Sequence, residues 1–448
     1  MSTTLTEPSR STPVFGAYEV VVVGGGPAGI AAAAAAGRQG RKTLLIERYG
    51  FLGGMGTAAG VTNFCGLHAN VHGEHKRVVH GVADELLERI DKLDGLNPPH
   101  LSFRNMIQAQ AYDISAYKIA ADELLASHGV NILFHALGVG AVAANGRIEA
   151  ILVETKEGRC AVRGECFIDC SGDGDLSAWA GAPFEKGDGQ GNMLYPSMMF
   201  RISGVDPERA GRAWETIPKL MAEAVAKGTH TFPRKGAIVR PQKNPIEWRA
   251  NMTQLKNADG LALDATDARQ LSRGEIEGRR QAWDVFQFVR QAVPGFEHAY
   301  IVEIGPQLGV RETRRVLGDY QLSEADVLAC ASFADTIGVN GWPIEAHVAG
   351  DVMLKFPPIP ESRGFNQLPY RMIVPGKTEN LFVAGRCASM THEGQSAARV
   401  SGACFVMGEA AGTAAHLSLQ AGVAPRQLDV GSLQRELEKQ GVYLGRSW

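Results

Sequence analysis

Four charged side chains lie close together near the end of the chain, and their types suit proton transfer and anion binding. Arg386, His392, Glu393 and Arg399 follow an apolar run at 381–384 in the stretch NLFVAGRCASMTHEGQSAARVSG. A histidine in such a loop can take a proton from a hydroxyl or an amine. It can equally hydrogen-bond a ligand or cap the loop. His392 is therefore our candidate acid/base, with Glu393 and Arg386 as candidate catalytic neighbours.

A second group of charges lies in GVRETRRVLGDY, where Arg311, Arg314 and Arg315 surround Glu312. A helix face paired by salt bridges accounts for Arg314 and Arg315. Arg311 follows the glycine-rich IGPQLG, and we expect it to turn toward a site. A buried guanidinium there suits a carboxylate or another oxyanion of a substrate. His347, in PIEAHVAGD, is predicted to be a structural histidine.

Glycines near the start of the chain indicate phosphate binding. Gly24, Gly26 and Gly29 form G-x-G-x-x-G between the apolar run YEVVVV and an alanine-rich stretch. The first glycine permits the tight turn, the second lets backbone approach a pyrophosphate, and the third packs helix on strand. The helix N-terminus offers N–H groups to the phosphates. Glu47 ends the run KTLLIE, where a carboxylate accepts from ribose hydroxyls and disfavours a 2′-phosphate. The pattern predicts a dinucleotide other than NADP.

Three later stretches favour FAD as that dinucleotide. Gly53, Gly54 and Thr57 follow the predicted ribose-binding strand, where the longer FAD molecule needs more backbone contact. SGDGDLSAWAG provides a second glycine turn after a strand. A helix start at Ser401 and Gly402 can stabilise negative charge on the N1–C2=O edge of a reduced flavin. We therefore predict FAD as the cofactor.

The elements that must position these groups can be read from the pattern. Residues 18–47 predict a βαβ unit: a strand buried on both faces, a glycine turn, a helix to about Arg38 and a second strand. YDISAYKIAADELLASHGV predicts an amphipathic helix, and NILFHA the strand behind it. Residues 139–170 predict short strands joined at Asn145-Gly146 and Glu157-Gly158. The βα pattern returns at residue 380 and ends in a long helix of small residues.

The length of 448 residues exceeds what one hydrophobic core usually supports, about 250–300 residues. We expect an α/β fold: a Rossmann-like FAD-binding domain assembled from separated segments, with an inserted mixed α+β substrate domain. The predicted parts are a disordered tail (1–16), the first part of the FAD-binding domain (17–182, with a helical insertion at about 60–128), the substrate domain (183–370), the C-terminal return of the FAD-binding domain (371–420) and a terminal helix (421–448).

Net charge, cysteine count and the N-terminal residues limit the kinds of partner and the location that we expect for this protein. A net charge of -3 argues against nucleic acid, and seven scattered cysteines do not form a disulfide framework. The N-terminal residues lack the apolar segment of a signal peptide, and no run is long enough to span a bilayer. We expect a cytoplasmic protein with a small-molecule substrate, no nucleic-acid partner and no membrane span. The electron acceptor and homo-oligomer formation stay open.

Together these motifs resemble the FAD-dependent oxidoreductase family of the glutathione-reductase-like flavoprotein superfamily. The resemblance rests on VVVGGGPAGIAAA with Glu47, LGGMGT, FIDCSGDGDLSAWAGA, IGPQLGVRETRRVLGDY and NLFVAGRCASMTHEGQSAARVSGACFVMGEAAGTAA. Many relatives carry Asp after the glycine of the last strand, whereas this chain has Arg386, which then contacts either pyrophosphate or substrate. The candidate FAD-binding residues are Gly24, Gly26, Pro27, Ala28, Gly29, Glu47, Arg48, Gly53, Gly54, Met55, Thr57, Gly385, Arg399, Val400, Ser401 and Gly402.

Two further groups of reactive side chains are not assigned to catalysis. Four histidines fall between residues 68 and 80, but no cysteine or suitably spaced carboxylate accompanies them, so no metal site is predicted. A loop on the substrate side of the flavin, or a covalent link from one histidine to the flavin, is the alternative use. Cys65 has no partner cysteine nearby, which favours a packing role.

The sequence therefore predicts an FAD-dependent oxidoreductase, either a dehydrogenase or an oxidase. We expect it to oxidise a small polar organic substrate by hydride transfer to flavin N5. The alternatives are reduction of an activated C=C bond, a flavin-dependent RNA-modifying protein and a non-catalytic dinucleotide sensor. Mild acidity argues against the RNA alternative.

Overall fold

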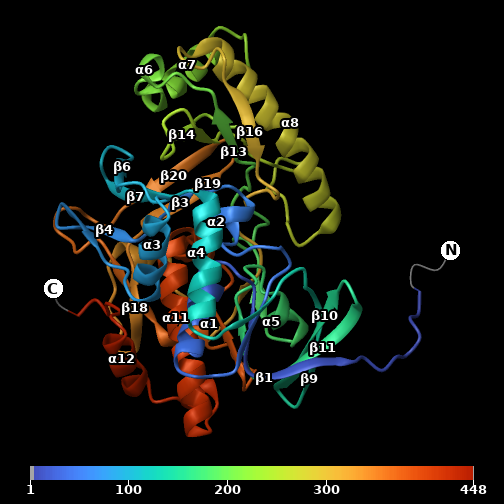
Figure 1. Cartoon of the computed structure of the whole chain (residues 1–448). Helices are drawn as coiled ribbons and strands as arrows, with labels where there is room; N and C mark the ends of the chain where they lie inside the picture. Colours follow the sequence, from blue (N-terminus) through green and yellow to red (C-terminus); the bar gives the residue numbers. More distant parts are fainter. Residues whose placement is uncertain (1–4, 447–448) are drawn as a thin grey trace.

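A seven-stranded sheet forms the centre of the larger part of the molecule (Figure 1). The computed structural model describes residues 5–446. The strand order is β8-β2-β1-β11-β10-β9, and β22 also pairs with β11. The bounds are β1 Val14–Val23, β2 Thr43–Ile46, β8 Asn131–Leu133, β9 Leu137–Ala144, β10 Arg147–Thr155, β11 Gly158–Asp169 and β22 Leu381–Val383.

The parallel half of this sheet contains the YEVVVV strand, which the sequence marks as buried on both faces. β1 runs parallel to β2 and β11, and β22 runs parallel to β11. β9, β10 and β11 form the antiparallel meander that the turns at 145–146 and 157–158 predict. Val14 already pairs with Ala161, so the strand begins inside the segment that was expected to be a disordered tail.

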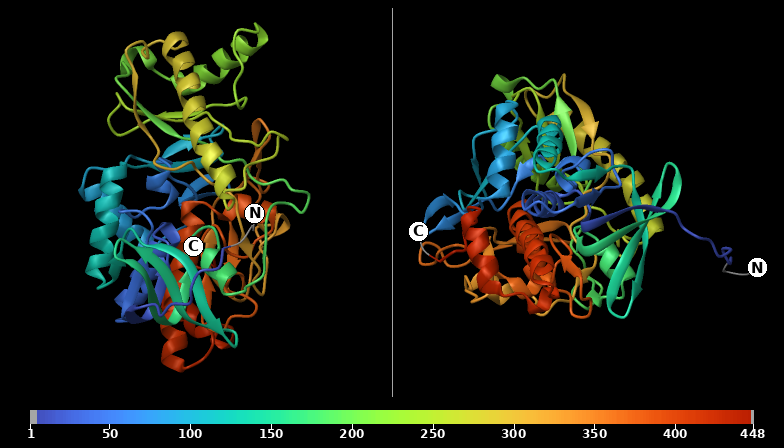
Figure 2. Two further views of the ribbon diagram at one scale, coloured as in Figure 1. Left: turned by 90° about the vertical axis from the view of Figure 1, so that its right-hand side faces the viewer. Right: turned by 60° about the horizontal axis from the view of Figure 1, so that its bottom comes forward.

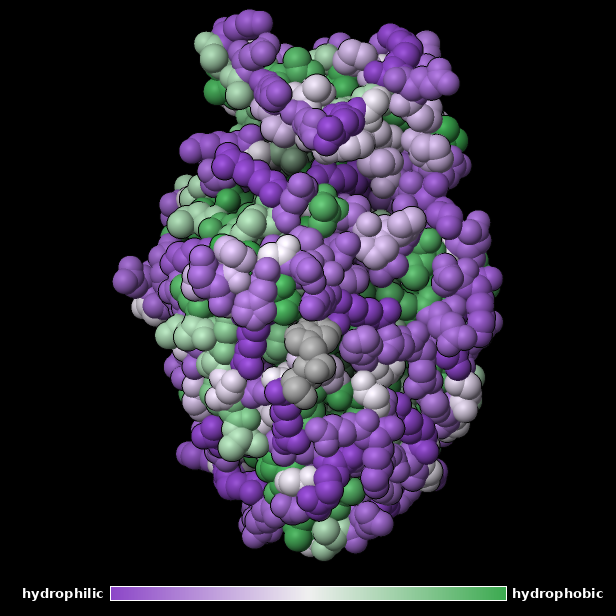
Figure 3. All heavy atoms as spheres, turned by 90° about the vertical axis from the view of Figure 1, so that its left-hand side faces the viewer, coloured by the Kyte–Doolittle hydropathy of each residue, from purple (hydrophilic) through white to green (hydrophobic). Residues whose placement is uncertain are grey.

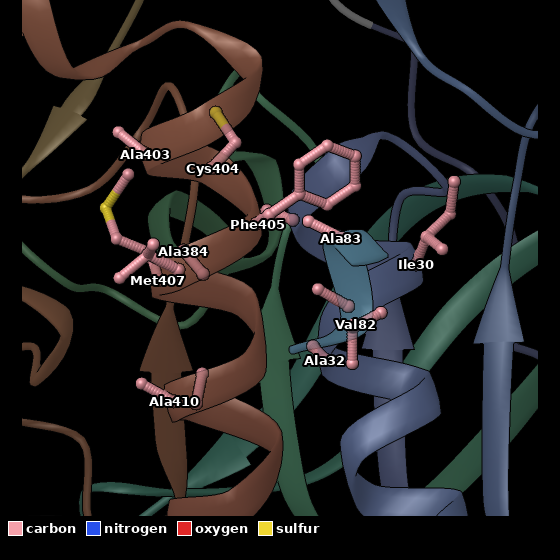
Figure 4. Packing of buried hydrophobic residues seen from close by; sticks show 14 of the residues in the cluster. Ile30, Ala32, Val82, Ala83, Ala384, Ala403, Cys404, Phe405, Met407 and Ala410 are labelled. Carbon is pink, nitrogen blue, oxygen red and sulfur yellow. The ribbon is translucent and has the colours of Figure 1, made fainter. Parts of the chain in front are cut away.

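Two helices of small residues cover this sheet and contact each other along their length. They are α1 (Pro27–Arg38) and α11 (Ser401–Ala421). Glycine makes the contact possible, because a Cβ on Gly408 would lie 2.1 Å from the Ala28 carbonyl oxygen. In Figure 4, Phe405 projects from α11 toward α1, whereas Met407 projects on the opposite side of α11. The last fifty residues thus complete the core that the first forty begin.

A second core lies at one end of the molecule (Figures 1 and 2). Its antiparallel sheet has the order β14-β15-β13-β16. Helices pack with it, the longest being α8 of 25 residues. The bounds are β13 Phe200–Ser203, α6 Pro207–Ala210, α7 Ala213–Ala226, β14 Ile238–Pro241, β15 Trp248–Asn251, α8 Ala268–Ala292 and β16 Tyr300–Ile304.

This second core is smaller than the predicted substrate domain of residues 183–370. Its buried members run from Met198 to Val310, while Ile337, Val339 and Phe365 belong to the first core. The segments that follow residue 310 therefore pack back on the first core. Their elements are β17 Arg315–Val316, α9 Glu324–Leu328, β18 Thr336–Asn340, β19 Ile344–Val348, β20 Asp351–Lys355, β21 Asn366–Pro369 and a 3₁₀ turn Tyr370–Ile373.

The segment predicted as a helical insertion, at about 60–128, contains five short strands in addition to two helices. Two helices, α3 (Val82–Lys92) and α4 (Ile114–Ser127), pack near α1. Between them and before them lie β3 Asn63–Phe64, β4 His68–Val71, β5 Glu74–Arg77, β6 His100–Ser102 and β7 Ile107–Ala111. The remaining elements are α2 Met55–Ala58, α5 Asp175–Trp179, β12 Phe184–Glu185, α10 His392–Ala398, a 3₁₀ turn Pro425–Gln427 and α12 Val430–Lys439.

The face of the molecule in Figure 3 is mainly hydrophilic, with apolar groups in separated patches. Within residues 5–446, no helix has the length and apolar character that crossing a bilayer requires. The terminal helix predicted for 421–448 is α12, which packs against α11.

Candidate active site

A long cavity opens beyond the carboxyl ends of the parallel strands. Val23, Glu47, Cys170 and Gly385 line it from β1, β2, β11 and β22 in turn. In open α/β sheets this is the edge at which ligands bind. From there the cavity extends to β15 and β19, between the two cores.

The three glycines of the N-terminal motif have different roles. A Cβ on Gly29 would lie 1.8 Å from the Gly24 carbonyl oxygen, so Gly29 lets the helix sit against the turn. Gly24 has a φ of +100°, and a Cβ there would lie 2.4 Å from the Cys170 carbonyl oxygen. Gly26 lines the cavity, and its missing Cβ leaves open space, the nearest atom being Gly54 Cα at 3.7 Å. Of the three glycines, only Gly26 has no protein atom where its Cβ would be. A ligand in the cavity can therefore come close to its backbone.

Two helix N-termini face this cavity without a side-chain cap. α1 begins after Gly26 and α11 after Val400, and neither first turn contains an acidic residue. Uncapped N–H groups and the helix dipole suit a ligand with negative or polar groups at two separated places. FAD has this character, with its pyrophosphate and its flavin ring. The cavity therefore fits the cofactor that the sequence predicts.

Glu47 lines the cavity at the end of β2. Its carboxylate accepts hydrogen bonds from Gly25 N at 2.6 Å and Tyr49 N at 3.0 Å. Burial raises the pKa of Glu47, although both backbone donors oppose that shift. The neighbouring Arg48 also lines the cavity and donates to Gln307 Oε1 at 2.8 Å.

Several predicted FAD-binding residues support the wall instead of lining it. Thr57 Oγ1 donates to Leu52 O at 2.7 Å, and a Cβ on Gly53 would collide with Thr57. A Cβ on Gly402 would lie 2.2 Å from the Gly66 carbonyl oxygen. Together with Gly29, these residues hold neighbouring segments close. The predicted FAD-binding residues that do line the cavity are Gly24, Gly26, Pro27, Ala28, Glu47, Arg48, Gly54, Met55, Gly385, Arg399, Val400 and Ser401.

The second glycine turn is organised by a fully buried carboxylate. Asp169 accepts hydrogen bonds from the backbone and hydroxyl groups of Ser171 and Ser177, at 2.7–3.1 Å. Arg386 then joins this turn to the C-terminal segment, because its Nη2 lies 2.9 Å from Asp173 Oδ1. Arg386 therefore lines the cavity at the end near the glycine turns, paired with a carboxylate.

The structure does not place His392 and Glu393 in the cavity wall. His392 begins α10, and its Nδ1 lies 2.8 Å from Oε2 of the buried Glu312. Glu312 also accepts from Gly187 N and Leu194 N and pairs with Arg315. Burial alone would lower the pKa of His392, but the hydrogen bond and charge of Glu312 outweigh it and raise that pKa. The acid/base role of His392 stays a prediction, and the structure places its Nδ1 against Glu312, which also pairs with Arg315.

Arg311, Arg314 and Arg315 do not lie on one helix. Arg311 lines the cavity, donating to Tyr195 O at 2.7 Å and Ser197 Oγ at 2.9 Å. Arg314 pairs with Asp175 at 2.8 Å, and Arg315 lies in β17. The expected helix face is therefore wrong, whereas the expected orientation of Arg311 toward a site agrees with its position.

The end of the cavity near β19 holds two titratable groups that sequence reasoning did not place there. Trp342 Nε1 donates to Glu345 Oε2 at 2.8 Å, and Glu345 Oε1 lies 3.2 Å from His347 Nε2. Burial would raise the pKa of Glu345, but His347 and Arg399 lower it to about 2. Burial and then the charge of Arg311 lower the pKa of His347 well below its usual value. Glu345 is therefore ionised and His347 neutral near pH 7.

Arg249 was also missed by sequence reasoning. It lies on β15 and lines the cavity, with Nη1 donating to Val61 O at 3.1 Å. The signal in the sequence was the arginine within the run WRAN. Every residue of this strand is buried, and an arginine in a buried strand needs a partner.

Cys65 and the histidines of residues 68–80 carry no visible chemistry. Burial raises the pKa of Cys65 to about 12, so its thiol stays protonated, as a packing role requires. His72 and His75 contact the carbonyl oxygens of Pro360 and Asn105. In residues 5–446, no three side chains of the ligating types are grouped in a way that could hold a metal ion.

Comparison with known proteins identifies the family. Residues 19–437 match the family described as FAD dependent oxidoreductase. The chain belongs to that family. This FAD dependent oxidoreductase accordingly takes FAD as its cofactor, and the glycine turns and uncapped helices described above are the residues that would hold it.

Individual relatives of this FAD dependent oxidoreductase are distant. Dihydrolipoyl dehydrogenase of Trypanosoma brucei brucei is 53% identical over 45 residues, which cover 10% of this chain and only 9% of that protein. p-Nitrophenol 4-monooxygenase from Pseudomonas putida has a similar fold, with 12% identity, a TM-score of 0.50 and coverage of 97% of this chain and 90% of that chain. A geranylgeranyl bacteriochlorophyll reductase-like protein from Thermoplasma acidophilum gives a TM-score of 0.49 at 13% identity, over 94% and 82% of the two chains.

Proposed function

We propose that this oxidoreductase oxidises a small polar organic substrate, with His347 as the base and Glu345 as its positioning partner. The observation that carries the proposal is a neutral, buried histidine in the cavity wall, held by an ionised carboxylate. When bound, FAD would supply the two-electron acceptor for the hydride that leaves the substrate carbon. His347 takes the proton that leaves the substrate hydroxyl or amine.

The tautomer of His347 follows from its contact. Glu345 is ionised and can only accept a hydrogen bond, so His347 Nε2 carries the proton in that contact. The lone pair then lies on Nδ1, for which the described part of the chain offers no hydrogen-bond donor. A neutral imidazole with one nitrogen fixed by a carboxylate is the arrangement that general-base catalysis needs.

The residues around His347 support a closed reaction site. Tyr195 N donates to the His347 carbonyl oxygen at 3.0 Å, and Tyr195 O holds Arg311, so the base and the arginine share one support. Trp342 and Val400 belong to one apolar cluster beside them. These groups position the substrate and limit water near the reacting atoms.

Anaerobic mixing of the FAD-loaded protein with small alcohols, amines and hydroxy acids tests the proposal. We expect at least one to bleach the flavin absorbance, and His347→Gln to slow that reduction by about 10²–10⁴-fold, the usual contribution of a general base. His392→Gln, which lies outside the cavity wall, serves as the matched control and should reduce at close to the wild-type rate. Reduction of the His347→Gln protein at the wild-type rate would rule out the base.

Two finer assignments accompany this proposal. We place the family within the glutathione-reductase-like superfamily, supported by the glycine turn after β1 and the C-terminal return of β22 and α11 to the same sheet. We also propose a cytoplasmic location, supported by seven cysteines that are all unpaired in the structure.

The oxidant that restores FAD is tested by admitting oxygen or a quinone after anaerobic reduction.

A further inference from the structure

The substrate end of the cavity has more positive than negative charge. Arg249, Arg311 and Arg399 line it there. Among the described residues, the carboxylates that line the cavity are Glu345 at this end and Glu47 and Asp175 near the glycine turns. With His347 neutral, three guanidinium groups face one carboxylate. The cavity wall therefore has two positive charges in excess at this end.

Burying this excess of positive charge costs free energy. The side chains of Arg249 and Arg311 are only 5% and 8% exposed, and within residues 5–446 neither they nor Arg399 form an ion pair. Arg315, which is equally buried, shows the usual solution, since it pairs with Glu312. A buried charge without a partner is strongly unfavourable, so one that persists beside a cavity indicates a partner that comes from outside the chain.

Some guanidinium nitrogens of these arginines donate hydrogen bonds, and others have no partner among the described residues. Arg249 Nη1 is used by Val61 O, whereas its Nε has no partner. Arg399 Nη2 donates to Glu345 O at 3.2 Å, and its Nε also has no partner. Arg249 Nε is enclosed by the protein, so Nη2 is the donor that remains for a carboxylate oxygen in the cavity.

Near the glycine turns, two arginines form ion pairs and Arg48 does not, since it donates to the neutral Gln307. Arg386 pairs with Asp173, and Arg314 pairs with Asp175. Of the cavity-lining arginines without an ion pair among the described residues, Arg249, Arg311 and Arg399 lie at the end with His347, where the proposed oxidation takes place, and only Arg48 lies near the glycine turns. Arg234 adds to this field from behind the wall, donating to Asn251 Oδ1 at 3.3 Å.

We propose that the substrate is a small organic carboxylate, and that Arg249 receives its carboxylate group while Arg311 and Arg399 supply the surrounding positive field. This inference names the substrate class of the proposed oxidation and rests on it for the reaction. The binding of a carboxylate at Arg249 is a separate property that does not require turnover. We expect the carbon that is oxidised to face His347, because Arg249 and His347 line the same end of the cavity.

The first experiment compares acids with their amides on the wild-type FAD-loaded protein. Malonate and succinate are titrated against malonamide and succinamide at constant ionic strength, with the flavin absorbance shift and the thermal midpoint as readouts. We expect the acids to bind at least about tenfold more tightly, the usual difference for a charge-assisted hydrogen bond. Equal binding of acids and amides would overturn the proposal. This comparison needs no variant, so a folding defect cannot obscure it.

The second experiment assigns the binding to Arg249. Arg249→Gln should weaken malonate binding by about tenfold to a hundredfold and leave malonamide unchanged, while Arg249→Lys should retain part of the affinity. Arg240→Gln is the control, since Arg240 lies opposite Arg249 in the β14–β15 pair but not in the cavity wall. An equal loss for the acid and the amide would count against Arg249 as the carboxylate ligand.

The outcomes separate this inference from the proposed oxidation. If malonate binds but no hydroxy acid or amino acid bleaches the flavin, the carboxylate site stands and the oxidation fails. If a neutral alcohol or amine bleaches the flavin and malonate does not compete with it, the oxidation stands and the carboxylate site is overturned.

Discussion

His347 and His392 show how the surroundings of one residue type decide its chemistry. Both lie within about 3 Å of a glutamate. Burial and Arg311 dominate at His347 and lower its pKa, whereas Glu312 dominates at His392 and raises its pKa. The first histidine is a base that is neutral at pH 7, and the second has its protonated form stabilised by Glu312.

These opposite shifts predict the pH dependence of catalysis. A base must be neutral to act, so the second-order rate constant for flavin reduction rises with pH through the pKa of the base in the free enzyme. With His347 as base, we expect this constant for a hydroxy acid to be level from about pH 6.5 upward. A rise through neutral pH, above the ordinary histidine range, would instead point to His392. Stopped-flow reduction between pH 6 and pH 9 distinguishes the two.

The same residues predict a pH dependence of stability. The folded pKa of His392 is raised, so the stability from its pair with Glu312 is fully present below about pH 6.5 and is lost as pH rises through the folded pKa. His392→Gln should therefore lower the free energy of unfolding by about 1–3 kcal/mol at pH 6 and by less at pH 9. Urea unfolding at the two pH values measures this. An equal loss at both would contradict the pairing.

At the scale of elements, the glycine turn before α1 offers a test with two neighbouring substitutions. Gly26→Ala places a methyl group in open space of the cavity, so we expect a folded protein with weaker FAD binding. Gly29→Ala places its Cβ 1.8 Å from the Gly24 carbonyl oxygen, so we expect a loss of stability of about 1–3 kcal/mol or more. FAD titration and thermal unfolding measure the two effects. Weak FAD binding with full stability in both variants would contradict the assigned roles.

What the sequence predicts well are elements whose signals are local. The βαβ unit, the hairpins at 145–146 and 157–158, and the start of α11 at Ser401 follow from apolar runs, glycines and turn residues that adjoin in the chain. Arg249, Glu345 and His347 could not be found in this way. They lie on short strands of two different sheets, and only the packing of β15 near β19 across the cavity brings them to one place.

At the scale of the whole molecule, FAD should act as a connector between distant segments. The cavity wall is built from residues 23–28, 46–56, 170–175 and 385–404, which belong to separate elements. Removing FAD should lower the thermal midpoint, and excess FAD should restore it, by about 2.7 kcal/mol of stability at a hundred times its dissociation constant.

Hydrogen exchange locates this effect. Protection should decrease together in those wall segments when FAD is removed, while the buried strands β13 and β15 of the second core change less. Loss of protection confined to the α1 segment would show that the C-terminal return does not contact the cofactor.

The contact between α1 and α11 has a consequence for how the protein is made. β22 begins 358 residues after β1 ends, which corresponds to about 20–70 s of synthesis on a ribosome. During that interval the alanine face of α1 has no α11 to cover it, and the cofactor cavity lacks the wall formed by residues 385–404. We therefore expect FAD capture to follow the synthesis of residues 385–421, and the alanine face of α1 to stay uncovered until then.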